Sequence, residues 1–372
     1  VAFQHVTIQG GKAAKGGAIY VGANATVTLE SGTILQNNSA YYLKVTTVDS
    51  EIVTTYYMGN GGAVYNEGTL YVTNTTITAD STGGTSATSY DVSGKGGGIY
   101  NTGTVEITAS TFTGNYAGKA PALDTDADNG QGGAIYNAGT LTVHAATMVE
   151  HTDGSGNVTY SVDTTTQTKF TNNRSYLDGG AIYNAGVANI YLEGNVISGN
   201  SAVNGGAFYN TSTLTITDNE TATHRATYKK LGDNSASSYG GAIYNASGML
   251  NLSYVSVVGN TASTDGSAIY FASGSGSILN ATFAENMGAG ATISVLNTAG
   301  TLSLKFVTIA TNTSSGLTIT AGTVALKNTL IAINGADGAS DLTGTYTDNL
   351  GNVISNGTYQ STLLFETGTI NT

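Results

Sequence analysis

A six-residue repeat, Gly-Gly-Ala-Ile-Tyr-Asn, recurs along the chain and constrains its fold more than any other feature. Clear copies begin at positions 16, 61, 96, 132, 179, 205, 240 and 266. The intervals between successive copies vary, and the shortest is 26 residues. A repeat of this period is typical of solenoids and propellers, in which each unit buries its apolar face against the next unit.

A second motif, an apolar residue followed three positions later by Asn, lies upstream of most copies. Examples are Phe112 with Asn115, Phe170 with Asn173 and Ile197 with Asn200. A third alternating run, such as 139–143, lies between the two motifs. Alternation with period two indicates strands, so each unit holds three short strands bounded by Gly or Asn.

Three strands and three turns in about 24 residues are typical of one coil of a parallel β-helix. We therefore predict an all-β fold: a right-handed, single-stranded parallel β-helix of about eleven coils. This β-helix would form a single domain over residues 1–372, with atypical coils over 328–372. A β-propeller is the alternative, but its blades need about 40 residues and four strands, which fits a 26-residue interval less well.

Stacked coils would bring equivalent residues of the repeat into columns. Asn amides in a column can hydrogen-bond from coil to coil, and Tyr rings in a column can stack. The small Gly-Gly-Ala segment fits a tight bend over a narrow interior. The expected column residues are Tyr65, Asn66, Tyr100, Asn101, Tyr136, Asn137, Tyr183, Asn184, Tyr209, Asn210, Tyr244 and Asn245, with Tyr20 and Tyr270 extending the aromatic column.

The composition excludes several classes of protein. Twelve Lys and Arg face 24 Asp and Glu, and a net charge of −12 repels the phosphates of nucleic acid. Cys is absent, which excludes a disulfide scaffold and a thiolate metal site. No apolar run approaches the roughly 18 residues that a transmembrane helix needs, so we expect no transmembrane segment.

The two alternating motifs resemble the GGAI and FxxN repeats of the chlamydial-type polymorphic outer-membrane proteins, and more broadly bacterial autotransporter passengers. The resemblance covers roughly residues 1–320. It implies a secreted rod displayed on the bacterial cell surface, often adhesive, that binds a glycan or a protein of a host or of another bacterium. The segment 328–354 more weakly resembles the closing coils of large bacterial surface β-helix proteins.

Where the interval exceeds about 26 residues, part of the chain must leave the coil. Such insertions are expected near 40–58, 79–94, 117–131, 146–168 and 219–233. Segments 41–58 and 144–170 have the pattern of hairpins, the second with its turn at 153–157. Loops on a rigid scaffold commonly carry binding. Tyr41, Tyr42, Tyr56 and Tyr57 are therefore candidate ligand-binding residues, unless their rings pack the hairpin onto the rod.

Asp124, Asp126 and Asp128 form the best candidate metal site. Carboxylates at alternate positions can converge on Ca²⁺, which makes Ca²⁺ a candidate cofactor. However, Ile135 stands where a calcium loop would have its Glu, and a solvated acidic loop explains the pattern equally well. No other cofactor is indicated.

These observations leave three functional hypotheses. The first is an adhesin that binds through its insertions. The second is a structural subunit of an extracellular fibre or biofilm matrix that assembles end to end, because a β-helix terminus exposes unpaired strand edges. The third, a polysaccharide lyase or hydrolase, has little support, because the four His are scattered and only Arg174 and Arg225 supply arginine. We therefore do not expect an enzyme.

Overall fold

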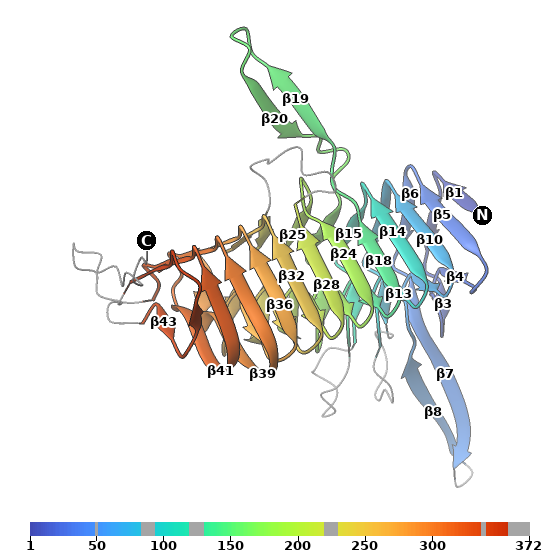
Figure 1. Cartoon of the computed structure of the whole chain (residues 1–372). Coiled ribbons are helices and arrows are strands. Elements are labelled where there is room, and N and C mark those ends of the chain that lie inside the picture. The colour runs from blue at the N-terminus through green and yellow to red at the C-terminus, as the bar shows by residue number, and fades with distance from the viewer. Residues whose placement is uncertain (49–50, 83–93, 119–129, 219–229, 336–339, 356–372) are drawn as a thin grey trace.

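The computed structural model describes residues 1–48, 51–82, 94–118, 130–218, 230–335 and 340–355. All regular elements in these ranges are β-strands, and they form a parallel β-helix: the chain winds in coils that stack into a rod (Figure 1). The predicted fold class is confirmed. No helix long and apolar enough to cross a membrane occurs in the described part.

Sheet B is the most regular face of the rod and holds twelve parallel strands, one from each coil. Its strands are β2 (Thr7–Gln9), β6 (Thr33–Gln36), β11 (Thr75–Thr78), β15 (Thr111–Thr113), β21 (Lys169–Thr171), β25 (Val196–Ser198), β29 (Lys230–Gly232), β33 (Ser256–Val258), β37 (Thr282–Ala284), β40 (Thr308–Ala310), β42 (Leu330–Ala332) and β45 (Val353–Ile354).

Sheet C is the narrow face and precedes the Gly-Gly bend. Its strands are β3 (Lys12–Ala13), β7 (Ser39–Val48), β12 (Ser81–Thr82), β16 (Tyr116–Ala117), β22 (Arg174–Ser175), β26 (Ser201–Asn204), β30 (Ser235–Tyr239), β34 (Thr261–Ala262) and β38 (Met287–Gly288), with β8 (Glu51–Met58) paired to β7.

Sheet A is bent and contains two columns of strands. The first column carries the Ile-Tyr-Asn segment: β4 (Ile19–Val21), β9 (Val64–Asn66), β13 (Ile99–Asn101), β17 (Ile135–Asn137), β23 (Ile182–Asn184), β27 (Phe208–Asn210), β31 (Ile243–Asn245), β35 (Ile269–Phe271) and β43 (Leu342–Thr343). The second column holds β1 (Ala2–Gln4), β5 (Thr26–Glu30), β10 (Thr69–Thr73), β14 (Thr104–Thr108), β18 (Thr140–Val143), β24 (Val187–Tyr191), β28 (Thr213–Thr217), β32 (Met249–Ser253), β36 (Ser275–Leu279) and β44 (Thr347–Asp348). Two long strands, β39 (Ala291–Lys305) and β41 (Ser315–Lys327), span both columns.

The core fills the inside of the coils with residues in register. Ile99 pairs with Ile135, which pairs with Ile182, and all three are fully buried. Phe112 and Phe170 stack at a centroid distance of 4.7 Å in sheet B. Because each coil contributes only one or two large side chains per strand, apolar burial depends on the coil above and the coil below.

The second glycine of the repeat is required because neighbouring coils approach closely there. A Cβ on Gly133 would lie 2.1 Å from the carbonyl oxygen of Gly180 in the next coil. The first glycine, Gly132, has a φ of +70°, which disfavours other residues. The two glycines are therefore required for different reasons: Gly132 for its positive φ, and Gly133 for the close approach of the next coil.

A first asparagine ladder marks the bend inside sheet A. Asn66 Nδ2 donates to Asn101 Oδ1 at 2.8 Å, and each further member donates to the next in the same way. The ladder ends at Asn245, whose Nδ2 donates to Ser273 O at 2.7 Å. Phe271 takes the column position in the next coil, and beyond it the bend is spanned by the long strands β39 and β41. The ladder members are Asn66, Asn101, Asn137, Asn184, Asn210 and Asn245, all fully buried.

A second, longer ladder runs along the bend between sheets B and C. Its members are the Asn of the second motif, with Asp at two positions. Each Asn donates both its backbone N–H and its Nδ2 to the next Oδ1, as Asn173 does to Asn200 at 3.0 Å, whereas Asp80 donates only its backbone N–H. We did not predict this ladder, although the spacing of three residues after a buried apolar residue was visible. Its members are Asn38, Asp80, Asn115, Asn173, Asn200, Asn234, Asn260, Asn286, Asn312, Asn334 and Asp341.

The insertions are shorter than the intervals between repeats indicate. Strand β12 continues sheet C through Thr82, and β29 already belongs to sheet B at Lys230. The ranges 79–94 and 219–233 therefore include coil residues at one end. If the chain left the coil earlier, backbone N–H and C=O groups of the neighbouring coils would lose their hydrogen-bond partners. For this reason the insertions are shorter than predicted.

Candidate binding surfaces

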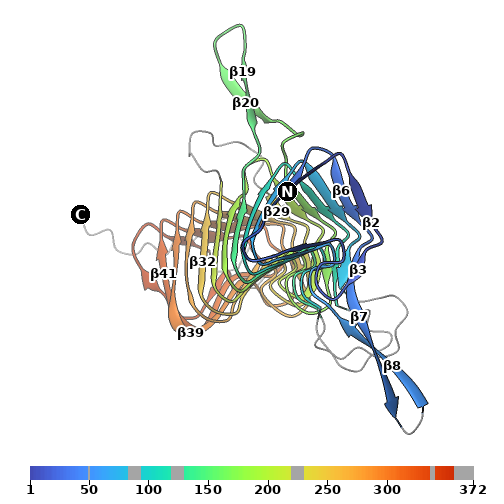
Figure 2. The same ribbon diagram turned by 90° about the vertical axis from the view of Figure 1, so that its right-hand side faces the viewer.

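Two hairpins leave the rod on opposite sides, as two perpendicular views show (Figures 1 and 2). The first, within the predicted insertion 40–58, consists of β7 and β8 paired antiparallel from Tyr41↔Met58 to Val48↔Glu51. The second, within the predicted insertion 146–168, consists of β19 (Met148–Thr152) and β20 (Val158–Val162).

The base of the first hairpin is anchored in the rod. Ser39 and Ala40 pair with β3 and β12, so the start of β7 is also a coil strand. Met58 is only 3% exposed and Gly59 N donates to Ala40 O at 2.8 Å. The direction in which the hairpin projects is therefore fixed by the sheet from which it grows.

The candidate tyrosines lie near this base. Tyr42 and Tyr57 face each other across the ribbon, with stacked rings at 5.0 Å and an interplanar angle of 11°. Tyr41 is half-buried and lies on the opposite face, where the Lys12 ammonium is 5.9 Å from its ring centroid. Tyr56 is paired in register with Leu43.

Farther out, the hairpin exposes apolar side chains. Val45 is 63% exposed and Ile52 is 77% exposed. The alternation of side chains and the register put both residues on the same face of the ribbon, one pair apart. A two-stranded ribbon with free edges and an apolar face can pair with or cover a partner surface.

The second hairpin also exposes apolar side chains, Val149 at 40% and Val158 at 48%, and hydrogen bonds fix its turn and its base. Asp153 Oδ1 accepts hydrogen bonds from the backbone N–H groups of Ser155 and Asn157, which closes the turn. The hydrogen bond from the Asn157 side chain, followed by these backbone hydrogen bonds, lowers the pKa of Asp153. At the base, Gln167 Nε2 donates to Gly194 O at 2.6 Å. Its cross-strand contacts, such as Tyr160 OH to Glu150 at 3.1 Å, are hydrogen bonds rather than apolar contacts.

A column of stacked tyrosines runs along the first column of sheet A. Successive rings from Tyr65 to Tyr270 stack with centroid distances of 4.7–5.2 Å. Burial raises the pKa of Tyr100 and of Tyr183 to about 12, and it also raises the pKa of Tyr209. Because the ring faces contact one another, the interior of the column offers only ring edges to a ligand.

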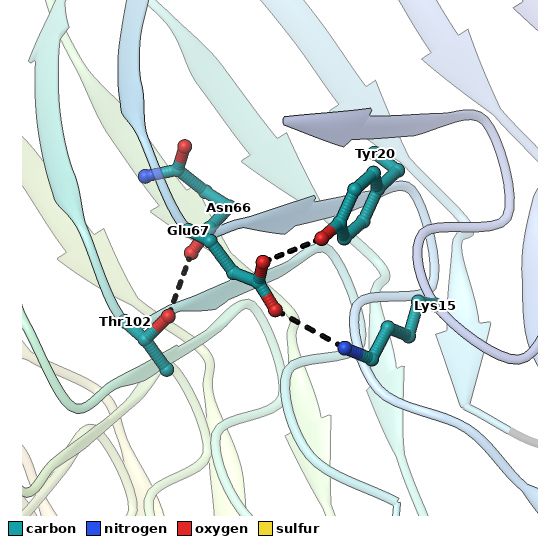
Figure 3. Close-up of polar contacts among 5 residues, drawn as sticks. All are labelled: Lys15, Tyr20, Asn66, Glu67 and Thr102. Carbon is teal, nitrogen blue, oxygen red and sulfur yellow. Dashed lines mark hydrogen bonds and ion pairs between the residues drawn. The ribbon is translucent and has the colours of Figure 1, made fainter. Parts of the chain in front are cut away.

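The N-terminal end of this column carries a charged cluster (Figure 3). Glu67 accepts a hydrogen bond from Tyr20 OH at 2.5 Å and lies 3.1 Å from Lys15 Nζ. The hydrogen bond from Tyr20 has the larger effect in lowering the pKa of Glu67, and the contact with Lys15 lowers it further. Lys15 also lies over the ring of Tyr65, 4.6 Å from its centroid, so it closes the end of the column. Tyr20 itself is 51% exposed.

Asp80 is the buried acid that sequence reasoning missed. It follows Ile77 by three residues, which is the spacing of the second motif with Asp in place of Asn. Its Oδ1 accepts from Asn38 N and Nδ2 at 2.6 and 3.0 Å, whereas its buried Oδ2 has no partner. Burial raises the pKa of Asp80 to about 7, although the hydrogen bonds from Asn38 act in the opposite direction.

The metal candidates Asp124, Asp126 and Asp128 lie outside the described residues. Within the described ranges, no group of three His, Asp or Glu side chains gathers in a way that could hold a metal ion. The Ca²⁺ site and end-to-end association stay hypotheses, as does the third one, a glycan-cleaving enzyme, which the sequence does not lead us to expect.

Two segments of the rod, 109–138 and 167–185, match the family model of the Chlamydia polymorphic membrane protein repeat. These two segments therefore resemble polymorphic membrane protein repeats. Each matched segment spans one Phe-x-x-Asn motif, which supplies a member of the second ladder, and the following Gly-Gly-Ala-Ile-Tyr. Each match thus covers the sheet B strand, the sheet C strand and the first-column strand of sheet A of one coil, and ends before the second-column strand. Searches of curated proteins and of solved structures gave no match.

Proposed function

We propose that this chain is the ligand-binding rod of a bacterial cell-surface protein, an adhesin that binds a host, matrix or neighbouring-cell surface through the β7–β8 hairpin. The exposed side chains of Val45 and Ile52 carry the proposal, because apart from Val1 they are the most exposed large apolar side chains in the described part of the chain. The resemblance to polymorphic membrane protein repeats supports the placement at the cell surface.

The shape of the rod supports the same role. Its coils form a rigid scaffold, and the hairpin stands away from the coil wall where a partner can reach both of its edges (Figure 1). The stacked pair of Tyr42 and Tyr57 stiffens the ribbon near its base, so less conformational entropy is lost on binding.

A pair of truncations tests the proposal. In the first, residues 43–56 are replaced by Asn-Gly, which closes a two-residue turn on the retained Tyr42–Tyr57 pair. In the matched control, residues 149–161 are replaced by Asn-Gly on the retained Met148–Val162 pair. Both variants leave the coils intact.

Protein-coated beads are counted on epithelial monolayers and on surfaces coated with collagen, fibronectin or glycans. We expect the β7–β8 truncation to reduce adhesion to background, and the β19–β20 truncation to adhere like the parent protein. Val45→Thr with Ile52→Thr should lower adhesion without changing the circular dichroism spectrum. Equal adhesion by the parent protein and the β7–β8 truncation would contradict the proposal.

A further inference from the structure

An apolar stripe lies along one corner of the last described coils, where sheet A turns into sheet B. Hydrogen bonds between coils define the corner: Tyr254 N donates to Leu279 O, Phe306 N to Lys327 O, and Asn328 N to Leu350 O. Phe306 is 52% exposed and Leu350 is 55% exposed. The corner stripe consists of Phe306, Leu330 and Leu350. Asn280 and Asn328, both exposed, occupy the positions equivalent to Phe306 in the two adjacent coils.

The backbone at this corner makes bulky residues unfavourable. Phe306 has a φ of 55°, and Leu350 has a φ of 73°. In other coils the same corner holds Asn74 with φ 46°, Ala109 with φ 52°, and, on either side of Phe306, Asn280 with φ 49° and Asn328 with φ 50°; these residues are smaller and better tolerated there. Exposed apolar side chains held in a strained conformation stabilise neither the core nor the turn, which indicates a role in binding.

Two lysines border the stripe. Lys305 and Lys327 are exposed, and they are paired in register on neighbouring strands β39 and β41. Like charges on directly paired positions repel each other, so this arrangement also costs stability unless an anion lies against it. The net charge of −12 repels anions at long range, so this pair of lysines attracts an anion only at distances shorter than the Debye length.

We propose that this corner docks onto an anionic lipid bilayer. The corner is the outward turn of the chain between sheets A and B, and Phe306 and Leu350 are exposed on it, so its side chains can enter a deformable surface. Phe306 and Leu330 would enter the boundary between headgroups and acyl chains, while Lys305 and Lys327 contact lipid phosphates. The rod would thus be held to a membrane by its C-terminal coils, and the β7–β8 hairpin, near the other end, would stay free.

Flotation with lipid vesicles tests the proposal on the full chain. One set of vesicles contains a third phosphatidylglycerol in phosphatidylcholine, and the other contains phosphatidylcholine alone. We expect binding to the anionic vesicles, weakened by salt, and little binding to the neutral ones. Lys305→Gln with Lys327→Gln should weaken binding about thirtyfold, from the usual contribution of two surface lysines.

Phe306→Asn with Leu350→Asn should weaken vesicle binding at least about tenfold. Because Asn tolerates positive φ, this variant should melt at or above the temperature of the parent protein, which separates loss of binding from loss of folding. The matched control is Met249→Asn, since Met249 is 45% exposed on a regular strand of the same sheet. It should bind like the parent protein.

Three results would overturn the proposal: no binding of the parent protein to anionic vesicles, equal binding to neutral vesicles, or unchanged binding after either double substitution. A dimer in sedimentation that Phe306→Asn dissociates would also overturn it, because a second copy would then be the occupant. The β7–β8 truncation should bind vesicles normally, so this test is independent of the proposed adhesion.

Discussion

Asp80 Oδ1 accepts two hydrogen bonds from Asn38, from the backbone N–H at 2.6 Å and from Nδ2 at 3.0 Å. In the equivalent position of the next coil, Asn115 uses its Nδ2 to donate to Ile77 O at 3.0 Å. Asp80 therefore puts a carboxyl oxygen, Oδ2, where the ladder needs a donor, and this oxygen is buried without a partner. A protonated carboxyl group can donate there as the amide does.

We expect Asp80→Asn to stabilise the rod at neutral pH. The pKa of Asp80 rises from 3.8 to about 7 on folding, so the folded state holds a proton that the unfolded state releases. The contribution of this proton to the free energy of unfolding is fully present below the unfolded-state pKa of 3.8. It decreases as the pH rises toward about 7, by up to roughly 4 kcal/mol. Urea unfolding of both proteins at pH values across this window measures the difference.

The variant should differ little from the parent protein in acid and should diverge from it progressively up to neutral pH. Asn173→Asp is the reciprocal control, since Asn173 occupies an ordinary position of the same ladder and is fully buried. It should introduce the same loss of stability at neutral pH. A pH-independent difference between Asp80→Asn and the parent protein would show that Asp80 is not the titrating group.

The first asparagine ladder should respond differently at its end and in its middle. Asn66 Oδ1 is buried without a partner, because Val21 occupies the column below it. Replacing Asn66 by Val removes this unpaired oxygen, which offsets the loss of the Nδ2 donor to Asn101 Oδ1, Gly68 O and Thr104 O. Asn101 Oδ1 still accepts from Gly103 N at 3.0 Å. We therefore expect Asn66→Val to change the free energy of unfolding by less than about 1 kcal/mol.

Asn137→Val should cost about 2–4 kcal/mol, because it removes the acceptor of Asn101 and the donor to Asn184 at once. Urea midpoints of the two variants give the comparison. If both substitutions cost the same, the ladder contributes through packing rather than through its hydrogen bonds.

Two glycines separate close approach from backbone conformation. Gly133→Ala would place a methyl group against the carbonyl of Gly180, at 2.1 Å, so the coils must separate. We expect a cost of about 3 kcal/mol or more. Gly114 has a φ of +63° and open space around it, so Gly114→Ala should cost only about 1 kcal/mol. Thermal unfolding of both variants measures the difference, and equal losses would refute the close-approach explanation.

The sequence predicted the architecture because the repeat itself has the period of the structure. Gly-Gly-Ala-Ile-Tyr-Asn fixes one bend and one strand per coil, and the alternation of side chains indicates the other strands. Asp80 was missed because it replaces the Asn by which the motif was recognised. The strain at Phe306 was missed because positive φ depends on where in the coil the residue falls, and insertions and degenerate copies obscure that register.

The hairpins show a second limit of sequence reasoning. The turn at Asp153–Asn157 was visible as a run of turn residues, and the alternation around it indicated two strands. Which side of the rod each hairpin leaves depends on the face from which it departs. Strand β7 grows out of sheet C, whereas the second hairpin departs between sheets A and B, as the placement of β18 and β21 shows. Opposite projection follows from these positions and could not be read from spacing alone.

The tyrosine column should give the protein an unusual alkaline titration. Burial raises the pKa of Tyr100 and Tyr183 to about 12, so the phenol form is favoured in the folded state. Tyr100, Tyr183 and Tyr209 should therefore remain phenols in the folded protein at a pH at which a tyrosine in the unfolded chain ionises, and the fold should lose stability as the pH rises further. Ultraviolet absorbance of phenolate, recorded against pH, measures this ionisation. In denaturant, the tyrosines that ionise at higher pH should ionise together with the others. Tyr183→Phe should reduce only the absorbance change at higher pH. A single transition near pH 10 in the folded protein would contradict the buried, stacked arrangement.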